Sequence, residues 1–163
     1  MADELDAGVD FAVVAYREEG EWQVVPLPPH AGTDLEVLIH ALRQSPGDAG
    51  SLGMVSIDED FFVLARVQGE AVRLLLSDIT AATEWPLARD VVNRLELPVP
   101  DEDEDALQPA GDMQILADLG CSAMDLAVLC DEDELYPDEM LEDIASRAGF
   151  APEYQSALET VGS

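Results

Sequence analysis

Two apolar runs on either side of Gly69 constrain the fold of this chain more than any other feature of its sequence. The Gly-Glu pair between them suits a two-residue turn with glycine at its first central position. A turn at Gly69 and Glu70 predicts a β-hairpin, within the stretch 60–78, in which Val67 faces Val72. Because alternate side chains of a strand point the same way, one face of this hairpin is wholly apolar. That face holds Val63, Ala65, Val67, Val72, Leu74 and Leu76.

The second face of the hairpin is mixed, because it combines apolar residues with Arg66 directly opposite Arg73. Such a pattern is typical of a sheet covered by helices on one side and partly wet on the other. Like charges opposite each other destabilise a sheet, so we expect a neighbouring acid to pair with these arginines, and Glu18 and Glu21 are the candidates. The alternative is an anion or a partner carboxylate held between the two guanidinium groups.

The runs around the hairpin complete an α+β pattern. In chain order we expect strands at 11–17 and 21–27, a helix at 33–44, a strand at 52–57, the hairpin, and a helix from 86 to 95. This order, ββαβββα, predicts an antiparallel sheet of about five strands with helices on one face. Thr33 is the expected N-cap of the first helix. Pro26 has no backbone N–H to donate to a neighbouring strand, so the end of the second strand should lie at an edge of the sheet.

The remaining chain predicts a linker and a small helical region. The expected organisation is a disordered leader at 1–10, an α+β domain at 11–95, an acidic proline-rich linker at 96–111 and a helical C-terminal region at 112–163. The linker has little that can be buried, so we expect it to be mobile. Four short helical patterns provide little independent stability, so the C-terminal region should dock on the first domain or on a partner.

The charge of the chain is strongly one-sided. There are 36 acids against 7 basic residues, all of them arginine, which gives a net charge of -29. Phosphates of nucleic acids and anionic membranes repel such a chain, whereas a basic protein surface attracts it. We therefore expect a basic protein partner, with no direct binding of nucleic acid or membrane. The candidate contact residues are Asp101, Glu102, Asp103, Glu104, Asp105, Asp131, Glu132, Asp133 and Glu134, unless these runs only solvate a linker and a loop.

The sequence shows no motif for catalysis, a cofactor or a metal. A glycine-rich phosphate loop, a nucleophile elbow and a nucleophile–base pair are all missing. Histidines and cysteines occur without zinc-ligand spacing. The run from Asp131 to Glu142 matches a calcium loop at positions one, three and twelve, but leucine and tyrosine stand at positions five and six. We therefore expect a protein without enzymatic activity and without a cofactor.

The two cysteines and the N-terminus predict a cytoplasmic protein. Cys121 and Cys130 are nine residues apart in one helical stretch, too far to bridge if the helix is continuous, so reduced thiols are expected. No run reaches the roughly 18 apolar residues that a transmembrane helix needs. The first ten residues are acidic and lack the apolar core of a signal peptide.

Three patches of sequence resemble a known family. They are VRLLLSDITAA at 72–82, GDMQILADLG at 111–120 and LYPDEMLEDIASRAGF at 135–150. In this order they resemble the bacterial tRNA adenosine deaminase-associated proteins, and the likeness extends from Phe11 to Val161. Members of that family are typically acidic, lack a catalytic motif and are named for gene proximity to the deaminase. The resemblance therefore implies that the deaminase is a neighbour of this protein, but it implies no catalytic residues.

Three functional hypotheses follow. The chain lacks the zinc motif of the deaminase, H-x-E with C-x-x-C, so it is not the deaminase itself. The first hypothesis is a non-catalytic accessory protein that binds a basic protein surface, with the deaminase as the expected partner. The second is a nucleic-acid mimic that inhibits a tRNA- or DNA-binding protein. The third is an unrecognised enzyme.

Overall fold

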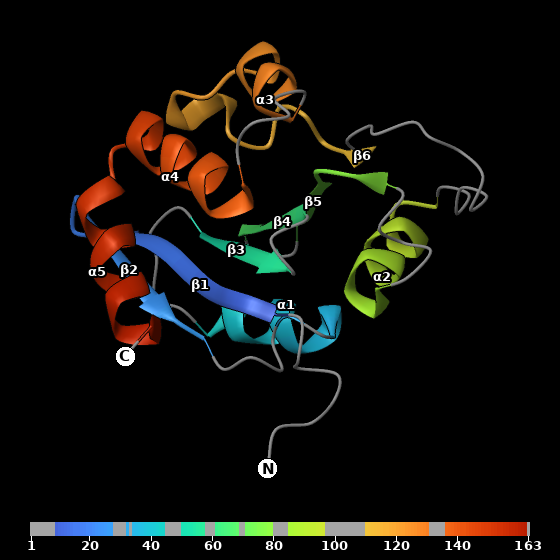
Figure 1. The fold of residues 1–163 in the computed structure, drawn as a ribbon, viewed down its shortest axis with the longest axis horizontal. Helices are drawn as coiled ribbons and strands as arrows, with labels where there is room; N and C mark the ends of the chain where they lie inside the picture. The colour runs from blue at the N-terminus through green and yellow to red at the C-terminus, as the bar shows by residue number, and fades with distance from the viewer. Residues whose placement is uncertain are drawn as a thin grey trace.

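An antiparallel sheet of six strands forms the middle layer of the described part of the chain (Figure 1). The computed structural model describes residues 9–27, 32, 34–44, 50–57, 61–68, 71–79, 85–96, 110–130 and 136–162. The strand order is β2-β1-β3-β4-β5-β6. The strands are β1 Val9–Glu18, β2 Glu21–Pro26, β3 Ser51–Ile57, β4 Phe61–Gln68, β5 Ala71–Leu76 and β6 Ala110–Gly111. The predicted α+β class is confirmed, with one short strand added to the expected five.

The central hairpin has the predicted register. β4 pairs with β5 so that Val67 faces Val72 and Arg66 faces Arg73. The turn at 69–70 lies outside the described residues. β2 is an edge strand, as its final proline predicted. β1 begins at Val9, inside the expected leader, of which residues 1–8 also lie outside the described part.

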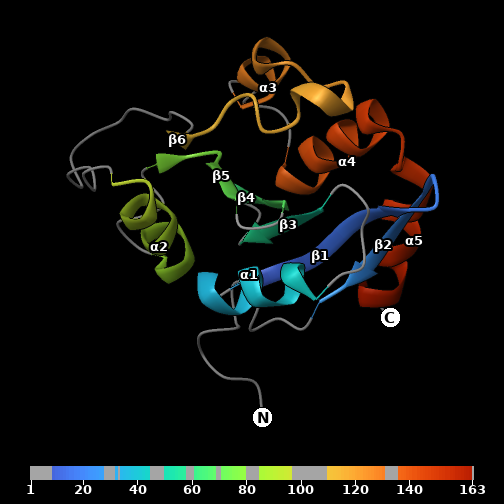
Figure 2. The same ribbon diagram turned by 180° about the vertical axis from the view of Figure 1, so that it is seen from behind.

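Helices α1 Leu35–Arg43 and α2 Pro86–Arg94 cover the apolar face of the hairpin (Figure 2). α1 lies so close to β3 that a Cβ on Gly53 would come within 3.1 Å of the Leu42 side chain. The N-cap of α1 is Asp34, not the predicted Thr33, because the Asp34 carboxylate accepts a hydrogen bond from the Glu36 amide at 2.9 Å. Pro86 begins α2 as expected.

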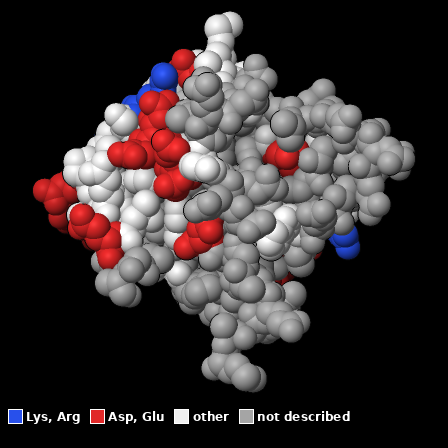
Figure 3. All heavy atoms as spheres, in the orientation of Figure 1, with Lys and Arg blue, Asp and Glu red and all other residues white. Residues whose placement is uncertain are grey.

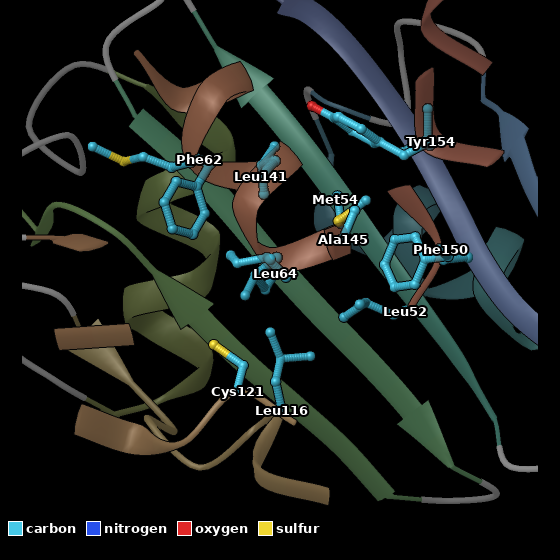
Figure 4. Close-up of a cluster of buried hydrophobic side chains, with 14 of the residues drawn as sticks. Leu52, Met54, Phe62, Leu64, Leu116, Cys121, Leu141, Ala145, Phe150 and Tyr154 are labelled. Carbon is cyan, nitrogen blue, oxygen red and sulfur yellow. The ribbon is translucent and has the colours of Figure 1, made fainter. Parts of the chain in front are cut away.

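The C-terminal region covers the second face of the sheet, which we expected to be partly wet. It consists of the 3-10 helix η4 Ala117–Leu119 and the helices α3 Ala123–Cys130, α4 Pro137–Ala148 and α5 Ala151–Gly162. Figure 4 shows side chains of the strands meeting Leu141 and Ala145 of α4 in one buried cluster. The expectation was wrong because Phe62 and Leu64 are fully buried under these helices.

Aromatic contacts join the C-terminal region to the first hairpin. The ring of Trp22 on β2 lies 4.8 Å from that of Phe150, centroid to centroid. The ring of Phe11 on β1 meets Tyr154 edge to face at 6.0 Å, and the Tyr154 hydroxyl donates to the carbonyl of Asp138 at 2.9 Å. The C-terminal region therefore packs on the sheet, whereas the division of the chain into domains at 11–95 and 112–163 stays a prediction.

β6 is the point at which the chain returns to the sheet. It pairs with Leu75 and Leu76 of β5, so the last two residues of the expected linker belong to the sheet. Gly111 has a φ of 120°, and a Cβ there would lie 2.2 Å from the carbonyl oxygen of Leu74. Only glycine fits this close approach. Residues 97–109 lie outside the described part.

The ends of the C-terminal helices follow local sequence signals. α4 begins at Pro137, one residue after its cap, and Gly149 ends it in the left-handed conformation. A capping box begins α3: the Ser122 amide donates to the Asp125 carboxylate at 3.0 Å and the Asp125 amide donates to the Ser122 hydroxyl at 3.2 Å. These signals fix where α3 and α4 begin, and with that the surface between them.

Candidate interaction site

The two paired arginines are held by acids that follow β6. Arg66 is almost completely buried, with 4% of its side chain exposed. It donates to both carboxylate oxygens of Asp118, at 2.8 Å for the Nη2–Oδ2 pair, and to the carbonyl oxygen of Ile115 at 2.8 Å. Arg73 is more exposed and donates to the Asp112 carboxylate at 2.6 Å. The like charges are therefore compensated.

These contacts correct the expected partners of the arginines. A carboxylate does lie within reach of each guanidinium group, but it belongs to Asp118 or Asp112 and not to Glu18 or Glu21. The hydrogen bonds from Arg66 and Arg73 hold the pKa of both carboxyl groups below its ordinary value. An anion or partner carboxylate between the two arginines would have to displace acids of this chain. We therefore assign the pair to the docking of the C-terminal region.

The predicted acidic contact residues lie outside the described part of the chain. This applies to both runs, Asp101–Asp105 and Asp131–Glu134. Their role as a contact surface stays a prediction. The second run connects α3 to α4 along the chain, and the described faces of these two helices hold the acidic surface discussed next.

An open groove of about 550 Å³ lies between α3 and α4. Its lining residues are Asp125, Val128, Leu129, Glu139, Glu142, Asp143, Ser146 and Arg147. Four of them are carboxylates and only one is a cation, so the groove is strongly acidic. Figure 3 shows acidic side chains gathered over the side of the molecule where α4 lies. This surface favours a positively charged ligand or partner.

Arg147 links the two walls of the groove. Its Nε donates to Asp143 on its own helix at 2.9 Å, and its Nη1 lies 3.4 Å from a carboxylate oxygen of Asp125 on α3. The Asp143 contact raises the pKa of the Arg147 guanidinium, which stays charged. Hydrogen bonds with Ser122 hold the pKa of Asp125 below its ordinary value. The Asp125 carboxylate that faces Arg147 is therefore ionised at neutral pH.

α3 is apolar on nearly all sides, although only one side of it is buried. Its sequence, AMDLAVLC, contains a single charged residue. Leu126 and Leu129 are buried, whereas 76% of Met124 and 63% of Val128 is exposed. The contact residues predicted from the sequence do not include this surface. The available signal was a helical segment without a polar face, since such a helix is normally buried.

The described residues show neither a cluster of metal ligands nor an ionised thiol. Among them, no group of three or more His, Cys, Asp or Glu is placed to hold a metal ion. The thiols of Cys121 and Cys130 are free, and burial raises the pKa of each to about 11, so both are protonated at neutral pH. Within the described part, no helix is long and apolar enough to cross a membrane.

Comparison with known proteins gives one family and one relative. The family described as Rv3753c-like tRNA adenosine deaminase-associated protein matches residues 10–151, a span that includes all of the sheet except Val9, and also α3 and α4. Protein Rv3753c of Mycobacterium tuberculosis (strain ATCC 25618 / H37Rv) is 36% identical over 154 residues, which is 93% of this chain and 89% of the relative. No solved structure matches.

Proposed function

The chain belongs to the Rv3753c-like tRNA adenosine deaminase-associated protein family, and from this premise we propose that it is a non-catalytic accessory protein of a tRNA adenosine deaminase. It binds a basic surface of the deaminase and performs no chemistry of its own. The family match over residues 10–151 is the observation on which this proposal chiefly rests. The net charge of -29 supports a basic partner.

The charge of the chain complements that of a tRNA-binding enzyme. An enzyme that binds tRNA needs lysine and arginine side chains to neutralise phosphates, so part of its surface is basic. A chain with 36 acids and 7 arginines is attracted to such a surface and steered towards it over a distance. Charge alone gives little selectivity, so a specific complex also needs shape and apolar contacts.

Complex formation between the purified chain and the deaminase of the same organism tests the proposal. We expect a complex at 50 mM salt whose dissociation constant rises at least tenfold at 500 mM, since screening weakens contacts between opposite charges. A serum albumin, which is also acidic, serves as the control for binding through charge alone. Absence of a complex at 50 mM salt, or equal binding of the albumin, contradicts the proposal.

Deaminase turnover on tRNA distinguishes an accessory protein from an inhibitor. An accessory protein leaves the rate unchanged or raises it when added in saturating amounts. A nucleic-acid mimic instead lowers the rate, and excess tRNA relieves this inhibition because both occupy the same basic groove. Inhibition of this kind would replace the accessory role with that of a mimic.

Two variants test the acidic runs as contacts. One changes every acid in Asp101–Asp105 to serine, and the other changes those in Asp131–Glu134 to serine. Each variant is the control for the other, because both reduce the negative charge by similar amounts. Weaker binding of both reflects total charge. Weaker binding of one alone identifies that run as a contact, and unchanged binding of both excludes the runs.

A further inference from the structure

The exposed side of α3 is an apolar surface without a partner in the described part of the chain. Met124 and Val128 are one turn apart on this helix, with 76% and 63% of their surface exposed. Residues four apart on a helix are neighbours, so the two side chains form one continuous patch. A helix that is apolar on all sides is normally buried, and exposed apolar patches commonly mark interaction sites.

The opposite wall of the groove holds carboxylates that repel one another. Glu139, Glu142 and Asp143 lie on one face of α4, three and four residues apart. Like charges at these spacings destabilise a helix. Among the described lining residues, Arg147 is the one cation opposite them, and it already bridges Asp143 to α3. A second cation bound here would relieve this repulsion.

The combination of charge and apolar surface selects the kind of occupant. A second copy of this chain also has a net charge of -29 and would be repelled. Nucleic-acid phosphates and anionic lipids are repelled in the same way. A partner helix with one apolar stripe and cations beside it complements both walls of the groove. The stripe can pack on α3 while the cations pair with the carboxylates of α4, as in other grooves that bind amphipathic helices.

We propose that the groove between α3 and α4 is the docking site for a basic amphipathic helix of a partner protein. Its apolar side chains pack on Val128 in the groove and on Met124, which lies one turn away at the edge of the groove. Its arginine or lysine side chains lie against Glu139, Glu142 and Asp143. Arg147 holds the two walls together and so positions the groove. The identification of the partner as the deaminase rests on the proposed function, whereas the chemistry of the occupant follows from the groove itself.

A synthetic peptide tests the groove on the full-length chain. The probe is a helical 16-residue peptide with leucine at every fourth position, so that the leucines form one stripe along the helix. Arginines lie on both sides of this stripe. At 50 mM salt we expect changes in amide chemical shift to concentrate in α3 and α4. Failure to bind, or shifts centred on another surface, overturns the proposal. Self-association of the chain through α3, measured by sedimentation, also overturns it.

Two neutral variants give the matched comparison. Met124→Gln with Val128→Gln removes the apolar patch without changing charge, and both side chains are exposed, so the fold should be retained. Val25→Gln, at a 42% exposed valine on β2, is the control. We expect peptide binding to weaken at least tenfold in the double variant and to be unchanged in the control. Equal binding of the two variants overturns the proposal.

The same variants separate this proposal from the proposed function. If the deaminase binds the wild-type chain and the double variant equally well, the groove is not the contact, but the accessory role stands. If the deaminase does not bind and the peptide still occupies the groove, the groove stands and its partner is another basic protein. If both bind the wild-type chain and both are lost in the double variant, both proposals are supported.

Discussion

Arg66 on β4 donates hydrogen bonds to both carboxylate oxygens of Asp118, which lies 52 residues further along the chain. Arg73 makes a similar bond to Asp112 across 39 residues. The two arginines face each other on adjacent strands, so their repulsion is removed only when the C-terminal region is docked. The docking contact thus compensates the unfavourable pairing of Arg66 with Arg73 in the central hairpin.

The two ion pairs should differ in their contribution to stability. Asp118→Asn leaves Arg66, whose side chain is 4% exposed, without its charged partner, and we expect a loss of about 1–3 kcal/mol. Asp112→Asn affects Arg73, which is 31% exposed and can bind water, so we expect a loss of at most about 1 kcal/mol. Urea unfolding at pH 7 measures both free energies. Equal losses would show that burial of Arg66 does not matter.

The same pairs predict how stability depends on acid. Asp112 and Asp118 have lowered pKa values in the folded chain, so their contribution is present above the ordinary carboxyl pKa of about 4. It is lost as the pH falls through the lower folded values. The difference in unfolding free energy between wild type and Asp112→Asn/Asp118→Asn should therefore shrink below pH 4. A difference that stays constant down to pH 2 contradicts this assignment.

Burial of both sheet faces predicts that Leu74 and Leu75 are equally sensitive. Leu74 faces α1 and α2, and Leu75 faces the C-terminal region, and both are buried. An aspartate at either position costs several kcal/mol against a typical stability of about 5–15, so each variant should fail to fold. Ala71→Asp, at an exposed position on the same strand, is the control. Thermal unfolding followed by circular dichroism measures all three, and a cooperatively melting Leu75→Asp variant contradicts the structure.

The sequence predicted what depends on local pattern. The register of the hairpin follows from a period of two around one turn, and the bounds of α4 follow from Pro137 and Gly149. The partners of Arg66 and Arg73 could not be predicted this way, because they lie 52 and 39 residues further on. An arginine in a strand normally indicates a solvent-exposed face. Arg66 is buried because Asp118, far along the chain, accepts its hydrogen bonds.

The groove was missed for a related reason. The residues of α3 indicate a helix, but no local signal shows which of its apolar sides faces the sheet and which faces solvent. That distinction depends on how the C-terminal region docks. The acidic runs are visible in the sequence because their acids are consecutive. The carboxylates of the groove are dispersed along two helices and come together only in the folded chain.

Gly111 should be far less tolerant of substitution than Gly20. Both have positive φ, 120° and 82° respectively, so alanine is strained at either position. At Gly20 a Cβ meets nothing within 4 Å, and we expect a cost of about 1–2 kcal/mol. At Gly111 it would lie 2.2 Å from the Leu74 carbonyl oxygen, so β6 must separate from β5, at more than about 2 kcal/mol.

Hydrogen exchange measures this separation directly. The amide of Asp112 donates to the Leu74 carbonyl oxygen at 2.8 Å, and its protection should be lost in Gly111→Ala and kept in Gly20→Ala. Equal protection in the two variants would show that β6 does not hold the returning chain against the sheet.

The two thiols should report unfolding through their reactivity. Burial raises the pKa of Cys121 and Cys130 from 9.0 to about 11, so at pH 8 the folded chain holds about a hundredfold less thiolate than the unfolded chain. Iodoacetamide should therefore label neither cysteine in buffer and both in urea, as measured by intact mass.

The raised pKa also means that the folded state loses stability as the pH rises above about 9, because only the unfolded thiols ionise there. A Cys121→Ala/Cys130→Ala variant should lose less stability between pH 9 and pH 11 than the wild type. Rapid labelling of the folded chain at pH 8 contradicts the raised pKa of these thiols.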